Sequence, residues 1–210
     1  MNNRIEIITK NIFLDIAIRA LYDRVGLHSK LCIIDFDSIV SLTELLNALR
    51  PLDPHYRVVL TGKAGVYSLL FKKFARLHKC TTLNEINSLI SDPDAPALFE
   101  IKERIFAYLS LQSITDRQIR ICALCCLYNI HTVASILKSS SKYIYQVINV
   151  TTRRMELKTM YHLCFFFTHE FSKDVLYKMA GVETSIREPQ INSYRTRKAE
   201  SCPATSFSAA

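Results

Sequence analysis

Side chains that can recognise nucleic-acid bases recur at regular spacing within residues 133–155. The second part of this stretch mixes amides, hydroxyls and basic groups with aliphatic residues three or four positions apart. Asn and Gln can hydrogen-bond to adenine edges, and Arg and Lys to guanine edges or phosphates. On a helix that starts near Ser141, the aliphatic residues share one face and the polar residues the other. The side chains expected to contact DNA are Ser141, Lys142, Tyr145, Gln146, Asn149, Thr152 and Arg153.

The residues before this helix have the pattern of a shorter helix and a tight turn. Val133, Ala134 and Leu137 would face inward, and the small Ala134 would let another helix approach closely. Three serines at 139–141 can form the turn and cap the second helix. The pattern predicts a helix-turn-helix over 133–138 and 141–155, with Ile144, Ile148 and Met155 buried. The same spacing also fits an ordinary solvated helix in a bundle.

Other reactive residues do not form a pattern typical of an enzyme or a metal site. The sequence CALCC places Cys122, Cys125 and Cys126 close together on one helix, but zinc would need two more ligands, and His131 is the nearest candidate. Buried thiols are the favoured interpretation. The sequence has no phosphate-binding glycine loop, dinucleotide turn or nucleophile elbow. We therefore expect no catalytic residues, no metal and no cofactor.

Composition indicates a helix-rich globular chain with an anionic partner. The 210 residues are 49% hydrophobic, with only four glycines and six prolines, and carry a formal net charge of +8. Residues 113–180 hold nine basic and four acidic residues, a net charge of +5 that suits phosphate contacts. Seven cysteines within mostly apolar runs, with no signal peptide or membrane span, favour a cytoplasmic protein.

The first ninety residues alternate between short apolar runs and amphipathic segments. Such alternation predicts a small open parallel α/β sheet. Strands are expected at 4–8, 30–36, 56–62 and within 78–82, and helices at 12–25, 41–52, 65–77 and 83–90.

A change of pattern follows at SDPDAP, residues 91–96, which is typical of a linker. The chain after it is helical: an amphipathic helix over 97–111, a helix with a capping box at Thr115 and Gln118, the helix-turn-helix, and an apolar helix over 157–171. We expect an α/β domain at 1–91, a linker and helix at 92–112, an all-α domain at 113–180 and a disordered tail at 181–210.

Residues 113–166 resemble the four-helix DNA-binding domain of LuxR-type transcription regulators. The matching motifs are ITDRQ at 114–118, VASIL at 133–137, SSKYIY at 140–145 and the pair Arg154 and Met155. The chain departs from the family pattern at Tyr128, where the family has glycine, at Tyr145, where it has lysine, and at Val147, where it has histidine. These departures concern the base-contacting residues more than the fold.

Residues 4–90 resemble, more weakly, the receiver domain of the same regulators. The resemblance places Asp35 at the phospho-acceptor position, Thr61 at the switch hydroxyl and Lys79 at the lysine of the last strand. The acidic pair that binds Mg²⁺ in such domains falls at Thr9 and Lys10, and neither is acidic. This implies a vestigial site in which Lys10 and Lys79 pair with Asp35. A strand-end or helix-capping aspartate is the alternative interpretation of Asp35.

Both resemblances together imply a DNA-binding regulator with an inactive receiver-like domain, similar to divergent fimbrial or virulence regulators of enteric bacteria. It would insert residues 141–155 in the major groove of double-stranded DNA, as a homodimer or as a heterodimer with another regulator. Aspartyl phosphorylation would not control it. The alternative is a non-catalytic interaction protein that pairs with a LuxR-type regulator through its apolar last helix.

Overall fold

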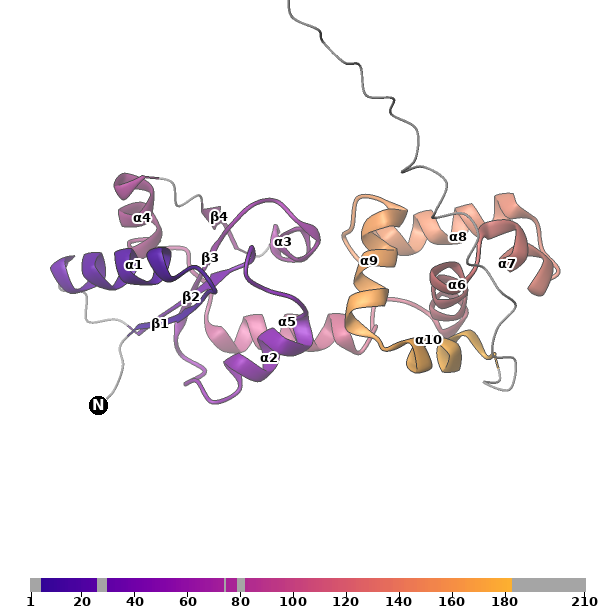
Figure 1. The fold of residues 1–210 in the computed structure, drawn as a ribbon, viewed down its shortest axis with the longest axis horizontal. Helices are drawn as coiled ribbons and strands as arrows, with labels where there is room; N and C mark the ends of the chain where they lie inside the picture. The colour runs from indigo at the N-terminus through magenta and orange to yellow at the C-terminus, as the bar shows by residue number, and fades with distance from the viewer. Residues whose placement is uncertain (1–4, 26–29, 74, 79–81, 183–210) are drawn as a thin grey trace, which may run out of the picture.

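A computed structural model describes residues 5–25, 30–73, 75–78 and 82–182 of the chain. It shows a parallel four-stranded sheet with helices in the N-terminal half and a helical remainder (Figure 1). Lys79 and the expected tail from 183 onward lie outside the described residues. No helix in the described ranges is long and apolar enough to cross a membrane.

The predicted parallel sheet is confirmed. Its strands are β1 (Ile5–Ile8), β2 (Leu31–Asp35), β3 (Arg57–Thr61) and β4 (Leu77–His78), hydrogen-bonded in the order β1-β2-β3-β4. Asp35 pairs with Thr61, and Thr61 with His78, so these positions share the carboxyl edge of the sheet.

Alternate residues of the central strands pack into two separate apolar layers, because successive side chains of a strand point to opposite faces of the sheet. Ile33 packs with α1 (Ile12–Val25) and α4 (Leu83–Ile90) on one face. Cys32 and Ile34 pack with α2 (Leu42–Leu49) and α5 (Leu98–Leu109) on the other. Helices α1 and α2 therefore leave the sheet toward opposite faces (Figure 1).

The helix expected over 65–77 is shorter than its periodicity indicated. Helix α3 (Val66–Phe71) ends in a tight turn in which the Lys72 amide donates to the carbonyl of Leu69. Leu77, which the helical pattern had included, pairs instead with Leu60 in the sheet. Strand pairing at the sheet edge thus overrides the local helical periodicity.

The segment expected to be a linker is docked on the α/β half. The Val58 amide donates to Pro96 O at 2.7 Å, and the Leu98 amide to Tyr56 O at 2.8 Å. Helix α5 then packs against α2 and β3, with Leu98, Ile101 and Ile105 fully buried. Residues 96–105, within the segment expected to be a linker and helix, therefore pack on this half.

Five helices fill residues 113–180, where four were expected: α6 (Asp116–Leu127), α7 (Ile130–Ile136), α8 (Ser141–Arg154), α9 (Met160–Glu170) and α10 (Lys173–Ala180). The predicted capping box of α6 is present, with Thr115 N donating to Gln118 Oε1 at 3.0 Å. The additional helix α10 packs along α6 and ends at Gly181, whose φ of 64° lies in the left-handed region.

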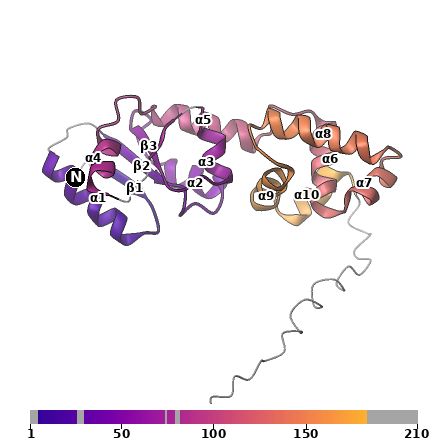
Figure 2. The same ribbon diagram turned by 90° about the horizontal axis from the view of Figure 1, so that it is seen from above.

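The two halves share one apolar cluster that runs from β2 and α5 into α6, α8 and α9. Polar contacts join them as well, because Glu170 at the end of α9 accepts from the backbone amides of Leu42 and Thr43 at the start of α2. Figure 2 shows α5 leading from the sheet half to the helical half.

Candidate nucleic-acid interface

Helices α7 and α8 are separated by a short turn, as the helix-turn-helix prediction requires. Helix α7 ends at Ile136, and Lys138 adopts a φ of 47°, which a continuous helix would not allow. Ser140 then caps α8, its hydroxyl oxygen accepting from the Tyr143 amide at 3.2 Å. The serine-rich segment is therefore a turn and a cap.

The inner face of α8 is the one expected. Ile144, Ile148 and Met155 are buried, and they fix the rotation of the helix against α6, α7 and α9. Thr152 was expected among the DNA-contacting residues, and that expectation is wrong. Its side chain is buried and its hydroxyl donates to the Ile148 carbonyl at 2.8 Å, so the hydrogen-bonding need of the hydroxyl is met within the helix.

The outer face of α8 carries a stripe of four exposed residues, Lys142, Gln146, Asn149 and Arg153, which we call the outward stripe. Their spacing of four, three and four residues aligns them along one side of the helix. At a rise of 1.5 Å per residue the stripe is about 16 Å long, which suits a helix lying in a major groove about 12 Å wide. Two amides lie in the middle and a cation at each end.

The remaining predicted contact residues flank the stripe. Tyr145 is 52% exposed and lies to one side of it. Ser141 is half-buried, and its hydroxyl lies 3.4 Å from Nδ1 of His131 at the start of α7. The structure thus places Ser141, Lys142, Tyr145, Gln146, Asn149 and Arg153 at or near one surface and removes Thr152 from it.

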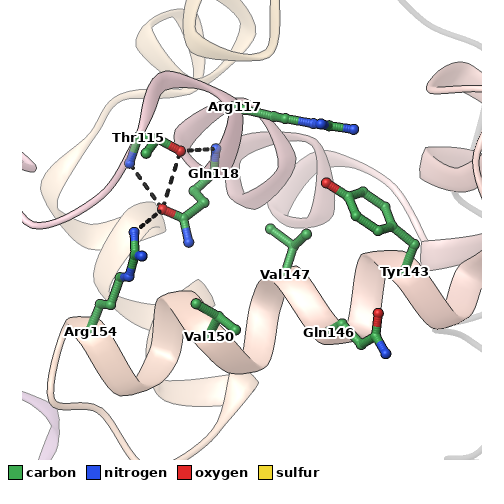
Figure 3. Close-up of a pocket in the computed structure, with 8 residues that line it drawn as sticks. All are labelled: Thr115, Arg117, Gln118, Tyr143, Gln146, Val147, Val150 and Arg154. Atoms are coloured by element: carbon green, nitrogen blue, oxygen red, sulfur yellow. Dashed lines mark hydrogen bonds between the residues drawn. The ribbon is translucent and has the colours of Figure 1, made fainter.

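A hollow of about 390 Å³ lies on the other side of the stripe, between the start of α6 and the outer face of α8; we call it the α6–α8 notch (Figure 3). Arg117 and Arg154 stand at its two ends, with Val147 and Val150 between them (Figure 3). Gln146 lines the notch and also belongs to the outward stripe.

Arg117 and Arg154 were not among the contact residues expected from the sequence. Arg117 precedes the capping-box glutamine, and Arg154 ends the same helix as the stripe. In the sequence, only their positive charges could have pointed to a contact with DNA. The packing of α6 against α8 brings the two side chains to one hollow.

The carboxylate nearest to the end of α8 is withdrawn from this surface. Glu156 follows the helix with a φ of 59°, and its carboxylate lies 3.0 Å from the Arg104 guanidinium and 3.4 Å from Lys73 Nζ. Helix α8 itself contains no acidic residue. The exposed charge of the outward stripe and the notch is therefore positive.

A second hollow of about 670 Å³ lies at the carboxyl edge of the sheet, beside Asp35. It forms because α1 and α2 leave toward opposite faces, which parts the loops that follow β1 and β2. Asp35 is buried, and hydroxyls of Thr9 and Ser38 donate to its Oδ2 at 2.7 and 2.6 Å. The Asp37 amide donates to Oδ1 at 3.1 Å. Each oxygen of this carboxylate thus has a donor.

The expected pairing of Lys10 with Asp35 is wrong. Lys10 Nζ lies 3.7 Å from Glu44 Oε1, on an exposed surface, while Thr9 supplies the contact to Asp35. A hydroxyl donor is the better partner here because it satisfies a buried oxygen without burying a second charge. Thr61 is buried, and its hydroxyl donates to the His78 carbonyl at 3.1 Å. The third residue of the expected site, Lys79, is not among the described residues.

The thiols of the helical half are free, and burial raises the pKa of Cys122 and Cys125 to about 12. Within the described ranges, no group of three or more His, Cys, Asp and Glu residues could hold a metal ion.

No protein-family model matches this chain, and a search of curated proteins finds no match either. The geometry of the two candidate sites therefore carries the functional argument.

Proposed function

We propose that this chain is a DNA-binding transcription regulator of the LuxR type, in which α8 enters the major groove of double-stranded DNA. The outward stripe is the observation that carries the proposal. Its central amides, Gln146 and Asn149, suit the donor and acceptor edge of adenine, and the terminal cations Lys142 and Arg153 can reach the phosphates on both sides of the groove. A solvated bundle face has no requirement for that order.

The experiment separates base contacts from phosphate contacts. Selection of a preferred duplex from a random library is followed by affinity measurements with that duplex and a scrambled one. We expect Gln146→Ala and Asn149→Ala each to lose about 1–3 kcal/mol on the preferred duplex only. Lys142→Ala and Arg153→Ala should weaken binding to both duplexes and reduce the salt dependence.

Two results would count against this function. One is that the purified chain binds no duplex even at low salt, and the other is that the library shows no preferred sequence. Lys178→Ala, on α10, is the charge-matched control and should change neither affinity.

The α/β half, in our proposal, is a receiver-like domain that aspartyl phosphorylation does not switch. The Asp35 carboxylate already accepts three hydrogen bonds, two of them from hydroxyls, and Thr9 occupies a position where Mg²⁺ chemistry needs a carboxylate. Control would then come from the abundance of the protein or from a partner.

Pairing with a second regulator is a further candidate function, and exposed apolar residues favour it. Phe13 is 81% exposed, Ile12 66% and Ile16 58%, all at the start of α1. The apolar helix expected over 157–171, which the sequence suggested as the pairing surface, corresponds to α9. It instead buries Phe166 and Phe167 within the chain. A dimer that is lost on Phe13→Ser would support the α1 surface.

A further inference from the structure

We propose that the α6–α8 notch follows the DNA strand that flanks the outward stripe, with Arg117 and Arg154 each holding one of its phosphodiester groups. This inference rests on the proposed function and adds two contacts that the stripe does not contain. It also makes the binding surface asymmetric, with a cationic seat beside α6 and Tyr145 on the opposite side of the stripe.

Arg154 is fixed at one end of the notch by a neutral partner. Its NH1 donates to Gln118 Oε1 at 3.0 Å, and the same oxygen accepts from the amide and the hydroxyl of Thr115 at 3.0 and 3.2 Å (Figure 3). A guanidinium has five N–H donors, and this hydrogen bond uses one. An amide oxygen orients the guanidinium without cancelling its charge, so the remaining donors can bind an anion.

Arg117 is fixed at the other end by an aromatic ring. Its guanidinium carbon lies 5.0 Å from the ring centre of Tyr143. Contact with a ring face leaves the edge donors of the guanidinium free for a planar pair of hydrogen bonds, which is the geometry that phosphate oxygens accept. No ion pair among the described residues includes either arginine, and no carboxylate lines the notch.

The position of the notch favours a nucleic-acid strand over a free anion as the source of the phosphate. Gln146 belongs to both the notch and the outward stripe, so a strand bordering a groove filled by α8 would pass over the notch. Contacts to phosphates beside a helix that lies in the groove fix the register of that helix on the duplex. Free inorganic phosphate offers the same chemistry and must be distinguished by experiment.

The test measures the affinity of the full chain for a duplex of unrelated sequence at several salt concentrations, by fluorescence anisotropy. Arg117→Ala removes one cation, and Arg154→Gln removes the other while keeping an amide donor for Gln118. We expect each variant to lower the salt slope by about 0.9 and the affinity about tenfold at low salt. Lys173→Ala is the control, because Lys173 also lies over a ring, that of Tyr177, but on α10 and outside the lining of the notch. It should behave as the unmodified chain does.

The outcomes separate this inference from the function on which it rests. A chain that binds no duplex overturns both. A chain that binds, with an unchanged slope in Arg117→Ala and Arg154→Gln, overturns the phosphate seat alone. Inorganic phosphate at matched ionic strength is the last arm. Binding of phosphate to the unmodified chain but not to Arg117→Ala, without displacement of bound DNA, would assign the notch to a free anion and overturn the inference. Unfolding curves of the variants should match that of the unmodified chain, since Arg117 is exposed.

Discussion

Replacing Glu170 should weaken the junction between the two halves of the chain. Its carboxylate receives the Leu42 amide at 2.6 Å and the amide and hydroxyl of Thr43 at 3.2 Å, so it caps α2 from a position 127 or more residues away in sequence. Ser41 already caps the same helix through the Glu44 amide. Glu170 therefore satisfies the two first amides of α2, which that serine does not reach.

The size of the effect follows from what water can replace. Hydrogen bonds to a charged group contribute about 1.5–3 kcal/mol each, but the Thr43 contacts are exposed and water would take them over. The amide of Leu42 is part-buried, and its loss resembles the removal of a helix cap, about 0.5–2 kcal/mol. We expect Glu170→Ala to lower the free energy of unfolding by about 1–2 kcal/mol, and Glu170→Gln, which keeps one oxygen, by about half of that.

Urea unfolding followed by circular dichroism measures this loss in the full chain. Glu103→Ala is the matched control, since Glu103 is exposed on α5 and a surface substitution of this kind changes stability by about 0.5 kcal/mol or less. An unfolding free energy for Glu170→Ala that equals that of the control would refute this expectation. The hydrogen bonds from the two amides of α2 to the carboxylate would then contribute no stability.

Three further outcomes follow from the contacts described. Ile148→Ala empties a fully buried site beneath α8 and should cost about 2–5 kcal/mol in urea unfolding. Burial opposes ionisation of Asp92, but its hydrogen bonds from His78 and the Asp94 amide lower its pKa below 3.8. Its stabilising effect is then present at neutral pH and is lost as pH falls through its lowered pKa, so Asp92→Asn should destabilise the chain at pH 7 and progressively less as pH falls below about 4. Incubation with acetyl phosphate and Mg²⁺ should leave the intact mass unchanged; an adduct that disappears in Asp35→Ala would contradict the locked site.

Local signals predicted the elements that depend on local chemistry. Helices at 12–25 and 83–90 have the expected bounds, and the capping box at Thr115 is where the motif places it. The helix expected over 65–77 failed, because the pairing of Leu77 with Leu60 is a long-range contact that periodicity does not contain. The docking of this segment was not predictable for the same reason, since Pro96 and Leu98 hydrogen-bond to Val58 on β3 and to Tyr56 just before it.

The candidate site divides in the same way. Helical periodicity indicated the outward stripe, since Ile144, Ile148 and Met155 mark the buried face of α8. Thr152 lies at the border of that face, where a helical wheel does not distinguish a buried residue from an exposed one. Its hydroxyl hydrogen-bonds to the preceding turn of the helix. Arg117 could be assigned only after α6 was placed against α8, because 37 residues of chain separate it from Arg154.

The docked segment at 91–97 limits the freedom of the two halves of the chain to move relative to each other. With α5 packed on the sheet, Glu156 paired to Arg104 and Glu170 bound at α2, helix α8 keeps one direction relative to the α/β half. In a two-fold dimer formed through that half, the distance and angle between two such helices would be set by the protein. Each base pair added between half-sites turns one of them by roughly 35° about the DNA axis, since a turn takes about 10–10.5 base pairs. A rigid dimer of this kind would accept one spacer length and reject its neighbours, whereas a chain with a free linker would bind several.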